Sequence, residues 1–250
     1  MAGDNQYIVE VNDVSMRFNL AAERTDTIKE YIVKLLRGKL FFQEFWALKH
    51  ISFRIQPGDA VALIGVNGSG KSTLLKTIAG VMYPSEGNVV KRGSIAPLIE
   101  LGAGFDPELT ARENTYLNGA VLGHDRAFMD KHYKEIMDFA DLWEFENVPV
   151  KNFSSGMVAR LGFSIATIVQ ADILVVDEIL AVGDVGFQTK CHERMGQMLQ
   201  SGTTLFFVSH DIAQVRRLCH TAIWLDHGVI RQMGPMQEVC DAYMAFLNGA

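Results

Sequence analysis

The stretch "GVNGSGKST", from Gly65 to Thr73, constrains the fold of this chain more than any other part of it. It fits the pattern G-x-x-x-x-G-K-[ST], directly after an apolar run and directly before a segment with the apolar spacing of a helix. Glycines let backbone N–H groups wrap a phosphate, and the N-terminus of the following helix adds partial positive charge. The stretch therefore predicts a strand, a loop and a helix that together bind a nucleoside triphosphate.

Individual side chains of this phosphate loop have distinct expected roles. Lys71 is expected to neutralise the β- and γ-phosphate oxygens, and the Ser72 hydroxyl to bind Mg²⁺. The cofactors implied are ATP and Mg²⁺. The other residues expected to surround the phosphates are Gly65, Val66, Asn67, Gly68, Ser69, Gly70 and Thr73.

Composition and charge exclude several classes of protein. With 250 residues, 48% of them hydrophobic, the chain can bury the core of one α/β domain with an appended subdomain. A net charge of -6 argues against a chain that coats nucleic acid. The 3 cysteines lack C-x-x-C spacing, which favours a reducing compartment. No apolar run reaches ~18 residues and no leader opens the chain, so we expect it to stay in the cytosol.

The order of patterns predicts a single domain over residues 1–250. Tyr7 to Phe18 alternates like an edge strand, and "ALKHISFRIQPGDAVALIGV" predicts a hairpin that leads into a core strand. Residues from about 105 to 165 are mostly helical by periodicity and predict a helical subdomain. The runs "ADILVVDE", "TTLFFVSHD" and "TAIWLDHGVI" predict strands of a parallel sheet.

Two of these strands carry candidate catalytic residues at their carboxyl ends. In "ILVVDE", Asp177 can reach the metal through water, and Glu178 can polarise the attacking water. His210, in "FFVSHD", could contact the γ-phosphate and sense its loss. A histidine in this place could instead have only a structural role, with its hydrogen bonds made at the end of the strand.

The stretch "NFSSGMVARLGFSIAT" predicts a second anion-binding helix N-terminus. Ser154, Ser155 and Gly156 open an amphipathic helix, and such an opening suits a phosphate. One nucleotide rarely needs two phosphate-binding helix N-termini from the same chain. We therefore expect this one to serve the nucleotide of a second copy, with ATP held between the two subunits.

Taken in this order, "GVNGSGKST", "FSSGM", "ILVVDE" and "VSHD" resemble the ATP-binding subunit of an ABC transporter over nearly the whole chain. More narrowly, "LIELGAGFDPELTARENTYLNG" and "DEILAVGDVGFQTKC" resemble the subfamily that exports lipid-linked polysaccharides such as O-antigen, capsule and wall teichoic acid. The resemblance implies a RecA-like core with an antiparallel β subdomain. It also implies a homodimer beneath two copies of a polytopic permease, at the cytoplasmic face of the bacterial inner membrane.

The resemblance also assigns roles to residues. It implies that Glu178 is the catalytic base, that His210 is the switch residue, and that Ser155 and Gly156 donate to the γ-phosphate of the second copy. Asp184, in "AVGD", occupies the place of the family's loop at the dimer contact.

Some positions depart from the family pattern. In the signature stretch Ser154–Met157, Ser155 and Met157 stand where many members have glycine and glutamine. The family's metal-contacting glutamine is replaced by "IELGAG", in which Glu100 is the nearest candidate ligand.

The base of the nucleotide is expected to stack on an aromatic ring at the end of the first strand. Phe18 holds that place by sequence order, and Trp46 and Phe45 are rivals.

The segment from residue 25 to 42 is an unusual insertion between two predicted strands. Ile28, Tyr31, Ile32, Leu35 and Leu36 have helical spacing, and lysines and an arginine occupy other positions. The apolar stripe could pack on the domain, or the basic face could lie near anionic lipid headgroups. The resemblance favours the second reading, a helix at the membrane surface beside the entry of the lipid-linked glycan.

Alternatives remain from other classes. A non-transport ABC ATPase would predict a long coiled coil or a second phosphate loop, and an exporter of another substrate would share the motifs. A small-metabolite kinase would leave "FSSGMVARLGFS" unexplained. We expect no C-terminal glycan-binding domain of the kind that some relatives carry.

Overall fold

The computed structural model describes residues 6–21, 42–99, 101–177, 184–209 and 212–249. A smaller antiparallel sheet has the strand order β2-β1-β4, and a larger sheet has the order β5-β6-β7-β3-β8-β9. The strands are β1 Val9–Ala21, β2 Phe42–Ile55, β3 Ala60–Ile64, β4 Glu86–Lys91, β5 Ile95–Leu98, β6 Ile173–Val176, β7 Thr204–Val208, β8 Thr221–Asp226 and β9 Val229–Pro235.

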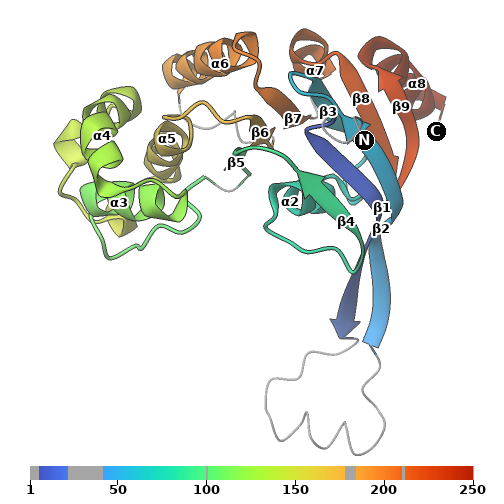
Figure 1. The fold of residues 1–250 in the computed structure, drawn as a ribbon, viewed down its shortest axis with the longest axis horizontal. Coiled ribbons are helices and arrows are strands. Elements are labelled where there is room, and N and C mark those ends of the chain that lie inside the picture. Colours follow the sequence, from blue (N-terminus) through green and yellow to red (C-terminus); the bar gives the residue numbers. More distant parts are fainter. Residues whose placement is uncertain (1–5, 22–41, 100, 178–183, 210–211, 250) are drawn as a thin grey trace, which may run out of the picture.

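Most of the described helices gather in two places, and α2 lies apart from both, beside β4 (Figure 1). The helices α3, α4 and α5 lie together at one side of the molecule, whereas α6, α7 and α8 accompany the larger sheet. The helices are α2 Lys71–Ala79, α3 Ala111–Val121, α4 Arg126–Ala140, α5 Ser155–Ala166, α6 Val185–Gln200, α7 Ile212–Leu218 and α8 Met236–Gly249, with short 3-10 turns at Trp143–Phe145 and Val150–Asn152. The predicted α/β fold, with an antiparallel β subdomain and a helical subdomain, is confirmed.

The central strands of the larger sheet are apolar because both of their faces are covered. Every residue of β3, β6 and β7 is buried. Parallel strands covered on both faces have such continuous apolar runs. Within β3, Ala62 and Ile64 belong to one core and Val61 and Leu63 to the other, as alternation along a strand requires. The carboxyl ends of these strands therefore stand between two packed layers.

The helical subdomain has a core of its own, and α5 joins it to the sheet. Leu161 and Ile165 of α5 pack with α4 residues such as Ile136 in this core. Phe163, between them in the sequence, packs instead in the core of the larger sheet, where its ring centroid lies 5.7 Å from that of Phe139. The helix α5 is thus shared between the two parts of the molecule.

Gly162 permits a close approach that a larger residue would prevent. A Cβ atom at Gly162 would lie 2.7 Å from the backbone nitrogen of Gly102. We expect Gly162→Ala to lower the free energy of unfolding by about 1–3 kcal/mol, because backbone must move to relieve the contact. Urea unfolding followed by circular dichroism measures the change.

Gly196, in α6, is the matched control for this prediction. A Cβ atom there would meet nothing within 4 Å. Gly196→Ala should raise the free energy of unfolding by about 0.4–1 kcal/mol, because alanine has less freedom to lose on folding. Equal effects of the two substitutions would contradict the close packing at Gly162.

Some sequence predictions lie outside the described ranges. Residues 25–41 of the predicted inserted helix are among them, and Phe42 is the first residue of β2. Among the described helices, none combines the length and the hydropathy that a membrane crossing requires.

Candidate nucleotide site

The phosphate loop connects β3 to α2, as the sequence predicts. Gly65 and Gly70 have φ angles of 148° and 106°, in the region that glycine adopts without strain. A Cβ atom at Gly65 would lie 2.3 Å from the carbonyl oxygen of Leu225, and one at Gly70 would lie 2.6 Å from that of Ala47. Both glycines are therefore required by the backbone that surrounds the loop.

Lys71 extends across the loop that precedes it. Its side chain is buried, and its Nζ donates to the carbonyl oxygens of Gly65 at 2.7 Å and of Val66 at 2.9 Å. Gly70 is the N-cap residue of α2, and a glycine has no side chain that could cap the first helical amides. Those amides and the ammonium group together form a positive site that suits an anion.

The turn between β8 and β9 supports the phosphate loop through backbone hydrogen bonds. The backbone N–H of Gly228 donates to the carbonyl of Ser69 at 3.0 Å, and the carbonyl of Gly228 accepts from the N–H of Lys49 at 2.8 Å. The sequence pattern of "TAIWLDHGVI" predicted a strand but not this contact with the phosphate loop. A glycine after a histidine in a strand-like run was the available signal, since it marks a tight turn.

A cleft of about 430 Å³ opens over the phosphate loop. Asp177, which follows β6, lines this cleft together with Ser72 and Val208. Val208 ends β7, and Ser72 lies in α2, which the phosphate loop connects to β3. The three residues meet because β6, β7 and β3 are successive strands of the parallel sheet, and their carboxyl ends lie at one edge. The remaining lining residues are Phe45, Ala47, Asn67, Gly68, Gly70, Lys71 and Thr73.

The donors in this cleft fit Mg²⁺. The Ser72 hydroxyl and the Asp177 carboxylate are hard oxygen ligands, and magnesium is commonly held by one or two protein oxygens together with phosphate oxygens and water. Three other predicted site residues, Glu100, Glu178 and His210, lie outside the described ranges. Their roles remain predictions.

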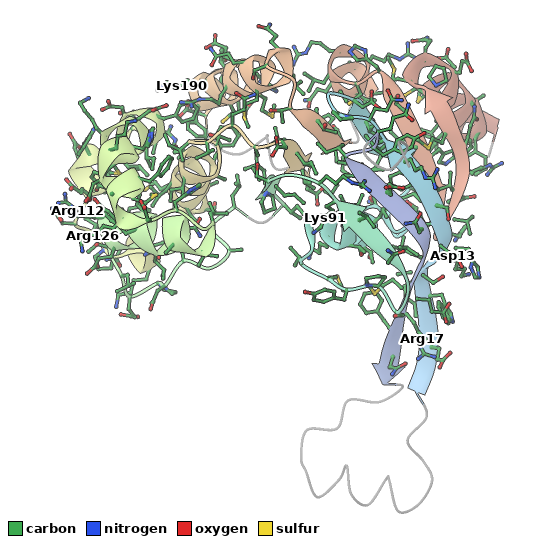
Figure 2. The ribbon with its side chains drawn as sticks, viewed as in Figure 1. Asp13, Arg17, Lys91, Arg112, Arg126 and Lys190 are labelled. Carbon is green, nitrogen blue, oxygen red and sulfur yellow. The ribbon has the colours of Figure 1, made fainter. Side chains whose placement is uncertain are left out.

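The three candidate aromatic residues differ in their surroundings. Phe18 and Phe45 are paired across β1 and β2, but Phe18 packs against a core cluster, whereas Phe45 is 47% exposed and lines the cleft. Trp46 lines an adjoining hollow that includes Gly68. The guanidinium carbon of Arg17 lies 5.6 Å from the Trp46 ring centroid, and Figure 2 shows Arg17 on the outer part of the β1–β2 ribbon. Phe45 is thus the described aromatic residue that borders the phosphate cleft.

The signature stretch forms the start of α5. Ser154 is the N-cap residue, and its hydroxyl accepts from the N–H of Met157 at 3.2 Å. Ser155 is exposed and Gly156 is half-buried, so the first turn faces outward. The residues that line the phosphate cleft include none from α5 among those described. The two predicted anion-binding sites are therefore separate within one chain.

Asp184 links α5 to α6. Its carboxylate accepts from the backbone N–H of Phe187 at 2.9 Å as the N-cap of α6 and pairs with the guanidinium of Arg160 in α5. The hydrogen bond from Phe187 holds the pKa of Asp184 below its usual range, and Arg160 adds to this. Asp184 was a candidate from sequence, whereas its partner Arg160 was not. An arginine in an otherwise small and apolar helix face was the available signal.

Comparison with known proteins identifies relatives over most of the chain. A family model described as ABC transporter matches residues 48–181, more than half of the chain. The O-antigen export system ATP-binding protein RfbB of Klebsiella pneumoniae is 43% identical over 84% of each chain. The teichoic acids export ATP-binding protein TagH of Listeria monocytogenes is 41% identical over 96% of this chain and 70% of its own. TagH of Bacillus anthracis is 39% identical, and this chain spans 43% of its length.

Solved structures agree on the fold. An ATP-binding subunit of an ABC transporter superposes with a TM-score of 0.73 at 22% identity, over 94% of this chain and 93% of the other. The dimeric ATP-binding cassette MJ0796, bound to ADP and Pi, superposes with a TM-score of 0.70 at 23% identity, over 91% of this chain and 98% of the other. The fold and the phosphate cleft define an ATPase with a phosphate loop. Its sequence places the chain more narrowly: it belongs to the ABC transporter family, among the ATP-binding subunits.

Proposed function

We propose that this chain is the ATP-hydrolysing subunit of an exporter of lipid-linked polysaccharide. The observation that carries the proposal is its identity of 43% to an O-antigen export protein and of 41% to a teichoic acid export protein. O-antigen and teichoic acid differ in chemistry, but both are lipid-linked polymers of the cell surface. The substrate class that they share is therefore the one that we assign, at the cytoplasmic face of the bacterial inner membrane.

Two copies of the chain would hold ATP between them. Within one chain the first turn of α5 lies outside the phosphate cleft, so Ser155 and Gly156 would complete the nucleotide site of the partner. The solved relative MJ0796 is dimeric, which supports this arrangement. Binding of ATP would close the dimer and hydrolysis would reopen it, which moves the permease between its states.

The residues of the cleft would each have a defined role in hydrolysis. Lys71 would neutralise the phosphates, and Ser72 and Asp177 would hold Mg²⁺, which supplies positive charge to the transferring phosphoryl group. Glu178 would accept the proton of the attacking water. The base would stack on Phe45, whose exposed ring borders the cleft.

An apolar groove offers the permease a place to dock. It measures about 190 Å³ and lies where the loop after β5, the end of α3 and the helix α5 meet, with Leu101, Val121 and Gly162 among its lining residues. Val121 is 69% exposed. Two copies of a polytopic membrane subunit would each insert a helix here, and the inserted segment of residues 25–42 would contact anionic lipid and the lipid-linked glycan.

Removal of the gene from its own host tests the proposed function. We expect surface glycan to fall and its lipid-linked form to accumulate in the membrane, as measured by glycan staining of whole cells and of lipid extracts. The parent gene should restore export.

A variant without residues 25–39 should retain ATP hydrolysis but fail to restore export, because it would lack the contact with the membrane surface.

Each result bears on a separate part of the proposal. Unchanged surface glycan after gene removal would overturn the assignment to polysaccharide export. Full restoration by the shortened variant would overturn only the role of the inserted segment.

A further inference from the structure

The helix α5 is anchored in its C-terminal half, at Gly162 and Phe163. Gly162 brings its backbone against that of Gly102, and Phe163 packs against Phe187 of α6, with ring centroids 6.1 Å apart. Arg160, 20% exposed at its side chain, adds contacts with α6 from the turn before. Its guanidinium pairs with Asp184 and lies 5.2 Å from the centroid of the Phe187 ring.

Both oxygens of the Asp184 carboxylate are used in this arrangement. Oδ1 accepts the hydrogen bond from the N–H of Phe187, which fixes the start of α6, and Oδ2 receives the guanidinium of Arg160. Another carboxylate, that of Asp141, lies 3.9 Å from the same guanidinium on the α4 side. The pair of Arg160 with Asp184 is a charge-assisted hydrogen bond, which is stronger than a hydrogen bond between neutral groups.

These contacts join the helix that carries the proposed signature residues to the helix that follows Asp177 in the sequence. Arg160 lies on the helix whose first turn carries Ser155 and Gly156. Asp184 begins the helix that comes next in sequence after Asp177 and β6. A shift of α5 against α6 would change where the first-turn amides of α5 are presented, whereas the phosphate cleft of the same chain would keep its lining.

We propose that Arg160 is a positioning residue, whose ion pair with Asp184 sets the placement of the α5 first turn for the nucleotide of the second copy. The proposal rests on the proposed function of this first turn. Arg160 touches no reacting atom in this scheme. It acts by holding Ser155 and Gly156 at the angle from which they can complete the partner's site.

Two substitutions remove the ion pair and keep the surrounding packing. Arg160→Met keeps an aliphatic stem over Phe187, and Asp184→Asn keeps an oxygen that can cap α6. Each should lower kcat for ATP hydrolysis about tenfold and weaken the ATP-dependent dimer, and the double variant should also lose about tenfold rather than a hundredfold. Arg160→Lys should recover part of the rate, because it keeps the positive charge.

The readouts separate positioning from loss of structure. The equilibrium affinity of the monomer for Mg-ATP, measured without hydrolysis, and the melting temperature should stay near the parent values. Arg216→Met is the matched control, since Arg216 forms a comparable ion pair with Asp241 on α8 at 2.5 Å. That variant should hydrolyse ATP at the parent rate.

Three results would overturn the proposal: unchanged kcat in Arg160→Met, effects of the two single variants that multiply in the double variant, or weakened binding of Mg-ATP to the monomer. Multiplying effects would assign Asp184 its own contact at the dimer interface instead. A parent protein that neither dimerises with ATP nor hydrolyses it would overturn the proposed function itself, which the variants alone cannot do.

Discussion

Replacing Glu178 with glutamine should lower the turnover of ATP by about two to four orders of magnitude, the usual contribution of a general base. Glutamine has nearly the shape of glutamate but cannot accept the proton of the attacking water. ATP would therefore bind without being cleaved. Steady-state phosphate release at saturating ATP and Mg²⁺ measures the loss.

The same variant should also become a stable dimer in the presence of ATP. Size-exclusion chromatography with mass analysis would detect it, because in the proposed cycle hydrolysis is the step that reopens the dimer. Glu144→Gln, at an exposed glutamate of the helical subdomain, is the control and should behave as the parent does. A Glu178→Gln protein that stays monomeric and hydrolyses ATP at the parent rate would show that Glu178 is not the base, and a kinase function would return as an explanation.

Replacing Lys71 with methionine should weaken the binding of Mg-ATP by about 10- to 100-fold, since a hydrogen bond to a charged group contributes about 1.5–3 kcal/mol. The Nζ of Lys71 also donates to the carbonyls of Gly65 and Val66, which would lose this donor. The loop itself should therefore become less ordered. Isothermal titration with a non-hydrolysable ATP analogue measures the affinity.

Lys91→Met is the control for the Lys71 substitution. Lys91 lies at the end of β4 (Figure 2), and burial lowers its pKa from the ordinary value. It too is a partly desolvated lysine, but it does not line the phosphate cleft. Its removal should leave nucleotide affinity unchanged. Equal losses in the two variants would indicate a general effect of removing positive charge.

The phosphate loop and the strand that carries Asp177 could be predicted from sequence because their signals are local. A strand, a glycine-rich loop and a helix follow one another in "AVALIGVNGSGKST", and each is adjacent to the next in space as in sequence. Asp177 directly follows β6, and Ser72 lies in α2, which the phosphate loop connects to β3. The two residues meet because β6 and β3 are separated only by β7 in the parallel sheet.

The contacts that could not be predicted join distant parts of the chain. Sequence order indicated Phe18 as the aromatic residue at the nucleotide, with Trp46 and Phe45 as rivals, and the structure adds that Phe45 lines the cleft. The pairing of β1 with β2 shifts register between Val11 and Val14 and twice more before Arg17, and no local pattern reveals such bulges. The pair of Arg160 and Asp184 likewise depends on how α5 packs against α6.

The hydrogen bond from Gly228 to Ser69 limits how far this protein can be truncated at its C-terminal side. The family match ends at residue 181, yet the backbone that buttresses the phosphate loop comes from residue 228. A fragment that contained only residues 48–181 would retain every glycine of the phosphate loop but would lose the hydrogen bond from Gly228 that supports it. Residues beyond the family match are thus part of the ATPase and more than an appendage to it.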